Sequence, residues 1–295
     1  MKKTIFKGSA TALVTPINEK GVNFDALEKM IEFQIAQNTD ALVICGTTGE
    51  APTLEDSEHL DAIECAVSAS KGRIPVIAGT GSNNTAHAIM MNKEAQKRGA
   101  DALLWVAPYY NKSTQRGLVK HYQSLAASTD LPAILYNVPS RTGSDIKAET
   151  VEELSKVENI VAIKEASGDV ARSVDIIARC GENIDVYSGN DDIIVPMMSV
   201  GAKGVISVLS NVVPKDTHEM CMHCLNGDYE KATKLQLKYF TLVKALFCEV
   251  NPIPVKTAMN LMGFDAGILR LPLYEMEEKN FNLLKEIMKS HGLIK

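Results

Sequence analysis

The chain has 295 residues, of which 45% are hydrophobic and 23% are charged, a composition typical of a globular protein with a large core. Thirty-one Lys and Arg residues against 36 Asp and Glu residues give a net charge of −5 without any long basic run, so we expect no nucleic-acid partner. No run of 18 apolar residues occurs, and the N-terminus lacks an apolar segment followed by a cleavage site, so we expect a cytoplasmic protein with no membrane partner.

Eight apolar segments rich in Val, Ile, Leu and Ala recur along the chain, and each predicts a buried strand. They are residues 10–16, 40–50, 74–81, 100–110, 131–139, 160–168, 184–191 and 204–210. Segments of helical period lie between them, for example 24–38 and 54–71. Such alternation predicts an α/β fold with a parallel sheet that is covered by helices. An open sheet with a dinucleotide site is disfavoured, because "GTGSNNT" lacks the third glycine of that motif. We therefore expect a closed (β/α)8 TIM barrel as the catalytic domain, over residues 1–225.

The strand pattern stops after the barrel. Residues 229–247 and 276–292 have helical periodicity, and the segment between them, 249–273, is predicted to be a loop. We therefore expect a C-terminal helical domain over residues 226–295.

Six cysteines are few for this length and show no disulfide framework, which fits a reducing compartment. The segment "HEMCMHC" would place His218, Cys221 and Cys224 on one side of a helix. A single CxxC without a second ligand pair is weak evidence for a metal. We expect ordinary helix packing there, and no metal site.

Polar side chains gather at the predicted strand ends, where the chemistry of such barrels is located. They are Thr47 and Thr48 in "CGTTGE", Tyr109 and Tyr110 in "PYYN", Tyr136, Asn137, Arg141 and Thr142 in "LYNVPSRTG", Lys164 in "VAIKEASGD", and the polar residues of "SGND". These groups are too many for a sealed interior, so they predict a pocket.

Lys164 lies in an apolar strand where a buried side chain is expected. Desolvation favours the neutral amine, which can attack a ketone to form an imine. Loss of a proton from that imine gives an enamine that adds to an aldehyde. The alternative is a structural lysine that extends to the strand end and pairs with Glu165 or Asp169.

Such chemistry needs a proton shuttle, and a phenol suits that role. Tyr136 ends the neighbouring strand, Thr47 is placed to hydrogen-bond it, and Tyr110 is placed to extend the chain towards solvent. Each tyrosine taken alone is equally well explained as a rim aromatic. Arg141 is suited to bind a carboxylate through two hydrogen bonds, unless it forms only a surface ion pair.

At these residues the sequence resembles the dihydrodipicolinate synthase family of pyruvate-dependent lyases and aldolases. "GSATALVTP", "GTTGE", "VIAGTGSNNT", "APYYN", "LYNVPSRTG", "IVAIKEASGD" and "SGND" follow the order and spacing of that family along essentially the whole chain. The resemblance implies a Schiff base between Lys164 and pyruvate, with Tyr136, Thr47 and Tyr110 as the proton relay. It implies that Arg141 binds the carboxylate of L-aspartate 4-semialdehyde, and that pyruvate is placed by Thr48, Gly189 and Ile206.

The resemblance also implies a place in lysine and diaminopimelate biosynthesis and a homotetramer built from two tight dimers, in which Tyr110 reaches into the neighbouring subunit's site. No cofactor is expected, because the lysine itself acts as the electron sink. The alternatives are another pyruvate-dependent aldolase, such as an N-acetylneuraminate lyase or a keto-sugar-acid aldolase, and a non-catalytic binding protein. Arg141 favours the synthase, because a polyhydroxylated substrate would need groups that recognise hydroxyls.

Some family members are inhibited by lysine, which binds at the tight-dimer interface. The matching positions here are Ala51, Pro52, Asp56, His59, Asn83, His87 and Tyr109. His87 stands where those members have a carboxylate for the ligand's ammonium group, and Ala51 lacks a hydroxyl. We therefore expect weak or absent inhibition by L-lysine, unless Asp56 supplies the missing charge.

Overall fold

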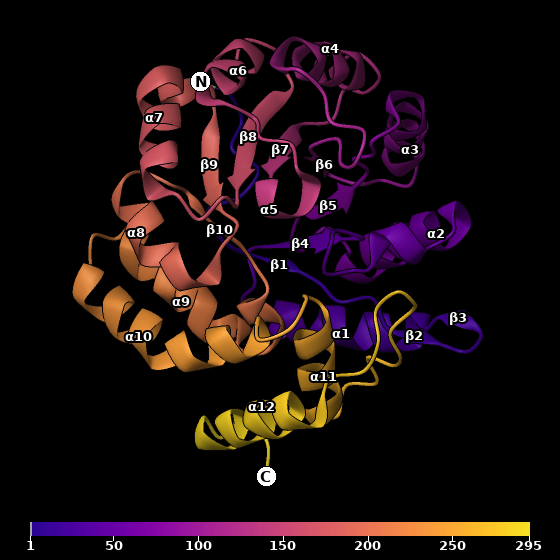
Figure 1. Cartoon of the computed structure of the whole chain (residues 1–295), viewed down its shortest axis with the longest axis vertical. Coiled ribbons are helices and arrows are strands. Elements are labelled where there is room, and N and C mark those ends of the chain that lie inside the picture. Colours follow the sequence, from indigo (N-terminus) through magenta and orange to yellow (C-terminus); the bar gives the residue numbers. More distant parts are fainter. Residues whose placement is uncertain (1) are drawn as a thin grey trace.

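The structure is a computed structural model that describes residues 2–295. Eight parallel strands close into a barrel in the order β1-β10-β9-β8-β7-β6-β5-β4 (Figure 1). They are β1 Gly8–Ala12, β4 Ala41–Ile44, β5 Val76–Gly79, β6 Ala102–Val106, β7 Ala133–Asn137, β8 Ile160–Glu165, β9 Asp185–Ser188 and β10 Gly204–Ser207. Each strand overlaps one of the eight predicted segments, so the predicted barrel is confirmed.

Helices cover the outside of this barrel. They are α1 Phe24–Ala36, α2 Asp56–Ser70, α3 Thr85–Lys97, α4 Gln115–Ala126, α6 Ala148–Leu154, α7 Val170–Cys180, α8 Ile194–Ser199 and α9 Pro214–Leu225. Polar residues fix where several of them begin: the side chains of Asn23, Asn84, Thr114 and Asp169 accept hydrogen bonds from the first turns of α1, α3, α4 and α7.

Short elements complete the connections around the barrel. They are the hairpin of β2 Ile17–Asn18 and β3 Gly21–Val22, the short helix α5 Pro139–Thr142, and the 3-10 turns η1 Ala51–Thr53, η2 Gly181–Asn183, η3 Asp191–Ile193 and η4 Leu209–Asn211. We had no sequence-based expectation for the hairpin.

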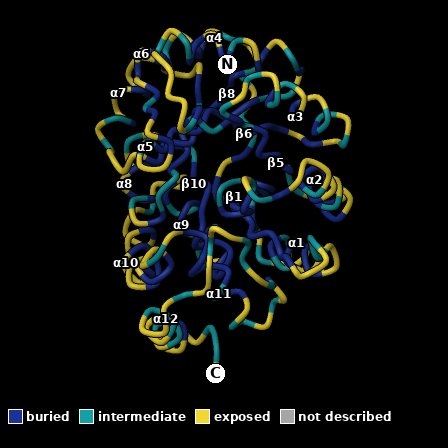
Figure 2. The backbone as a smooth tube through the Cα atoms, turned by 45° about the vertical axis from the view of Figure 1, so that its right-hand side comes forward, coloured by how far each residue is buried: buried dark blue, intermediate teal, exposed yellow. Residues whose placement is uncertain are grey.

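The barrel interior is filled mainly by small and branched side chains, including Ala10, Val43, Ile77 and Ala162. The ring of Phe6 stacks on Tyr187 with a centroid distance of 4.2 Å. Figure 2 shows buried residues at the centre of the molecule and exposed residues along the outer faces of the helices. The interior is therefore a packed core that leaves room for polar groups only at the strand ends.

The C-terminal region contains α10 Tyr229–Leu246, α11 Ile253–Leu261 and α12 Glu278–Ser290. α10 packs along α8 and α9, and α12 packs on α10 and α11. The predicted loop over 249–273 is wrong for residues 253–261, which form α11. Six of the nine residues of this helix are buried, so its sequence shows only a weak alternation of the polar and apolar residues that mark a surface helix. The domain boundary at residues 225 and 226 stays a prediction.

The segment "HEMCMHC" lies in α9, where Cys221 and Cys224 pack into the core, so the prediction of helix packing is confirmed. His218 instead binds Asp40, with 2.8 Å between Nδ1 and Oδ2. Within residues 2–295, no three His, Cys, Asp or Glu side chains gather as a metal site would require. Over the same residues, no helix is both long and apolar enough to cross a bilayer.

Candidate active site

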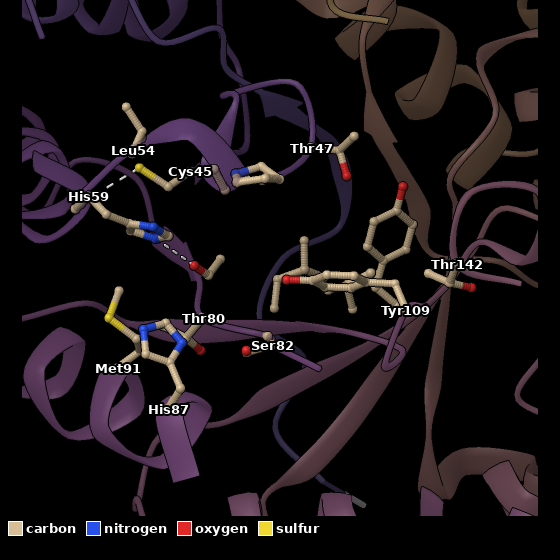
Figure 3. A pocket seen from close by; sticks show the side chains of 18 of the residues that line it. Cys45, Thr47, Leu54, His59, Thr80, Ser82, His87, Met91, Tyr109 and Thr142 are labelled. Atoms are coloured by element: carbon tan, nitrogen blue, oxygen red, sulfur yellow. Dashed lines mark hydrogen bonds between the residues drawn. The ribbon is translucent and has the colours of Figure 1, made fainter. Parts of the chain in front are cut away.

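A cavity of about 450 Å³ opens where several barrel strands end. Its lining includes Thr47 after β4, Tyr136 at the end of β7, and Arg141 in α5. In Figure 3, His59 and His87 lie on one side of this space, and Thr47, Tyr109 and Thr142 lie on the other. The cavity thus brings together polar residues from three of the five strand ends that the sequence singled out, those of β4, β6 and β7, whereas Lys164 of β8 is not part of its lining.

Lys164 and Tyr136 are neighbours on adjacent strands. They are paired in register between β8 and β7, and the Lys164 Nζ atom lies 4.4 Å from the centroid of the Tyr136 ring. Lys164 is only 6% exposed. The amine therefore lies against the phenol ring that lines the cavity.

The next pair in register, Asn137 and Glu165, faces the opposite side of the strands. The Asn137 Nδ2 atom donates to Glu165 Oε2 at 2.9 Å, and the Ser167 backbone N–H donates to the other carboxylate oxygen. Burial raises the pKa of Glu165. Asp169 caps α7 instead. Glu165 and Asp169 therefore bind other groups, and the structure does not support the alternative in which Lys164 pairs with one of them.

The turn between β4 and η1 carries Thr47 and Thr48. Cys45 and Glu50, on either side of the two threonines, both have positive φ, 54° and 55°. The backbone carbonyl of Gly49 accepts a hydrogen bond from Thr15 Oγ1 at 2.7 Å. Thr47 lines the cavity, whereas Thr48 is buried beside it.

Arg141 and Tyr110 differ in how the single chain places them. Arg141 lines the cavity, and its Nη2 atom donates to the Asn251 carbonyl at 3.1 Å. Tyr110 has φ 67° and is 92% exposed. It does not line this cavity, so the chain alone does not bring it to Tyr136.

Gly189 directly follows β9, and Ile206 lies in β10. The Gly189 N–H donates to the Glu165 carbonyl at 2.8 Å, and a Cβ on Gly189 would lie 2.4 Å from the Cβ of Ala166. Only glycine fits there without a shift. Ile206 is fully buried inside the barrel.

The residues predicted to form a regulatory region line the same cavity, apart from Asn83. They are Ala51, Pro52, Asp56, His59, His87 and Tyr109. His87 Nε2 lies 2.9 Å from Asp56 Oδ1, and His59 Nε2 lies 2.7 Å from the Gly79 carbonyl. Asn83 Nδ2 donates to the Tyr109 carbonyl. Asp56 is thus already paired with His87, the residue expected from the resemblance to replace the carboxylate that binds the ammonium group of lysine in inhibited family members.

Sequence reasoning missed three buried polar residues around this site: Glu50, Asn251 and Lys256. Glu50 stands inside the motif "GTTGE", so a signal was present. Asn251 and Lys256 fall in the segment that was predicted to be a loop, and local sequence gave no reason to place them near β4.

Comparison with known proteins covers the whole chain. The model of the family described as "Dihydrodipicolinate synthetase family" matches residues 5–291. The 4-hydroxy-tetrahydrodipicolinate synthase of Thermoanaerobacter sp. (strain X514) is 56% identical over 99% of this chain and 98% of its own length.

Solved structures agree with this match. A dihydrodipicolinate synthase from Acinetobacter baumannii, described as chloride inhibited and complexed with pyruvate, is 44% identical and superposes with a TM-score of 0.96 over 99% of this chain and 100% of its own. A synthase from Cyanidioschyzon merolae with lysine bound is 37% identical, with the same TM-score and coverage.

Proposed function

The chain belongs to the dihydrodipicolinate synthetase family, and from this premise we propose that it condenses pyruvate with L-aspartate 4-semialdehyde through a Schiff base on Lys164. The observation that carries the proposal is the buried Lys164 amine, which lies against the ring of Tyr136, a residue that lines a cavity together with Arg141. The product would serve lysine and diaminopimelate biosynthesis.

The proposed reaction starts when the Lys164 nitrogen attacks the pyruvate carbonyl carbon and water leaves, which gives an imine. A proton then leaves the pyruvate methyl carbon, and the resulting enamine carbon bonds to the aldehyde carbon of the second substrate, whose oxygen takes up a proton. Water returns to the imine carbon, which frees the lysine and leaves a ketone. The amino group of the product then bonds to the ketone carbon, water leaves, and the ring closes.

Protons in these steps need a relay, for which we propose Tyr136, Thr47 and Tyr110. Tyr136 and Thr47 line one cavity, which supports their part. Tyr110 is exposed beyond it, which suits a side chain that acts in a neighbouring subunit of a homotetramer. For substrate binding we propose Thr48, Gly189 and Ile206 as the pyruvate subsite.

Arg141 is proposed to bind the carboxylate of the aldehyde. It stands at the cavity with one nitrogen held by the Asn251 carbonyl, which leaves other N–H groups of the guanidinium to bind the substrate.

Turnover of pyruvate with L-aspartate 4-semialdehyde tests the proposal, with Lys164→Ala as the matched control. We expect activity in the wild type and its loss in the variant. Borohydride reduction in the presence of pyruvate should trap an adduct on Lys164. A trapped adduct without turnover would keep the Schiff base but refute this aldehyde as the acceptor.

We further propose that L-lysine inhibits this enzyme weakly or not at all. The Asp56 carboxylate, the one acidic group of the predicted regulatory region, is already paired with His87, so a ligand's ammonium group would have to compete for it. A titration of turnover with L-lysine checks this, and half-inhibition below about 1 mM, an affinity of roughly 4 kcal/mol or more, would contradict it. His87→Glu should increase sensitivity to lysine.

A further inference from the structure

The segment between α10 and α11 reaches the turn that carries Thr48. Asn251 Nδ2 donates to Thr48 Oγ1 at 3.0 Å, while the Asn251 backbone carbonyl accepts from Arg141 Nη2 at 3.1 Å. Asn251 itself is 6% exposed. One buried residue outside the barrel therefore contacts both a proposed pyruvate-binding residue and the proposed carboxylate-binding residue.

The direction of the hydrogen bond to Thr48 has a chemical consequence. A threonine hydroxyl has one hydrogen to donate and two lone pairs that accept. Because Asn251 donates to the oxygen, the Thr48 hydrogen stays available. The Thr48 hydroxyl can therefore donate that hydrogen to the carboxylate of pyruvate.

A buried ion pair holds the same turn two residues further on. Lys256 Nζ in α11 lies 2.5 Å from Glu50 Oε1, and these side chains are 1% and 0% exposed. Glu50 Oε2 accepts from the backbone N–H of Arg270 at 3.1 Å. In Figure 1, α11 lies between α12 and the barrel. Its Lys256 side chain reaches Glu50 in the turn after β4.

Glu50, the acidic member of this ion pair, has a strained backbone. Glu50 has φ 55°, in the left-handed region that side chains other than glycine seldom adopt. Both oxygens of the buried Glu50 carboxylate are bound, and these contacts hold its backbone at positive φ. Breaking either contact would leave charge without a partner in the interior. Strain of this kind, held by its surroundings, is found preferentially at functional sites.

We propose that the C-terminal domain completes the pyruvate subsite: Asn251, Glu50 and Lys256 are positioning residues that fix the turn over 46–50 and orient the Thr48 hydroxyl. This inference rests on the proposed function, because it assigns these residues to the pyruvate site of that reaction.

The first test is a double-mutant cycle on Thr48 and Asn251. We expect Asn251→Ala to raise the KM for pyruvate about tenfold, the loss of roughly one hydrogen bond, with a smaller change in kcat. The KM for the aldehyde should change less, because the substitution keeps the carbonyl that binds Arg141. In a Thr48→Val background, Asn251→Ala should add little.

The second test replaces the ion pair as a unit. Glu50→Gln combined with Lys256→Met removes both charges, so that neither is left buried alone. The matched control is Met288→Ala, a fully buried position in α12 outside the turn, which lowers stability by cavity formation. The double variant should raise the KM for pyruvate, whereas the control should lower the unfolding midpoint without that change.

Borohydride trapping at graded pyruvate concentrations gives a readout that does not depend on the aldehyde. A wild type without a trapped adduct or turnover would refute the proposed function itself. If the wild type is active, three results would refute the positioning role alone. They are a KM for pyruvate that stays within twofold in Asn251→Ala, additive effects of Asn251→Ala and Thr48→Val, and an equal rise of that KM in Met288→Ala.

Discussion

Asp191 shows what a single buried residue contributes to this barrel. Its carboxylate is 2% exposed and accepts hydrogen bonds from Ser207 Oγ at 2.5 Å and from the backbone N–H groups of Val208 and Leu209 at 3.0 and 2.9 Å. Burial raises the pKa of Asp191, while the nearby Lys164 charge and these donors oppose that rise. One side chain thereby joins the end of β9 to the end of β10.

We expect Asp191→Ala to lower the free energy of unfolding by about 3 kcal/mol or more, because two buried N–H groups and a hydroxyl lose their acceptor. Asp191→Asn should cost less, since the amide oxygen can still accept from the two backbone donors. Urea unfolding measures both. A loss below about 1 kcal/mol in the alanine variant would contradict this account of the β9–β10 connection.

The His218–Asp40 pair joins two elements, since His218 lies in α9 and Asp40 immediately precedes β4. Asp40 Oδ2 is shared, because it also accepts from the Ser9 backbone N–H in β1 at 2.7 Å. The hydrogen bond with Asp40 raises the pKa of His218 above its usual value. The pair thus fixes α9 to the N-terminal end of the barrel through a titratable contact.

This shift makes the contact sensitive to pH. A histidine whose pKa is raised on folding contributes stability that is fully present below its unfolded pKa of about 6.5 and is lost as pH rises through the folded value. We therefore expect the difference in unfolding free energy between the wild type and His218→Gln to shrink from about pH 6 to about pH 9. A difference in unfolding free energy that stays constant or grows over that interval would contradict a stabilising role of the protonated His218–Asp40 pair.

Elements differed in how far the sequence could predict them. The barrel strands were predictable because each is a short apolar run between helices of clear period, and several residues that line the cavity were predictable because motifs end those strands. α11 was missed because six of its nine residues are buried, which reduces the polar face that makes a helix visible in a sequence. The Lys256–Glu50 pair spans residues 206 apart along the chain, so no local pattern could have indicated it.

At the scale of the whole molecule, the single chain leaves one member of the proposed relay outside its cavity. Tyr110 is 92% exposed, although a large aromatic side chain gains free energy by burial. In a two-fold symmetric dimer each subunit would present Tyr110 to the other, so both sites would be completed by the same contact. The proposed reaction then requires the assembly.

Complementation between two inactive variants tests this arrangement. Lys164→Ala removes the nucleophile and Tyr110→Phe removes the relay hydroxyl, so each homo-oligomer should be nearly inactive. A heterodimer has one site with Lys164 from one chain and Tyr110 from the other, and that site should work. After unfolding and refolding an equal mixture, about half of the dimers are mixed and each has one complete site, so activity should recover to about a quarter of the wild type. Were Tyr110 to act within its own chain, every site in the mixture would lack either the amine or the hydroxyl, and mixing would restore nothing.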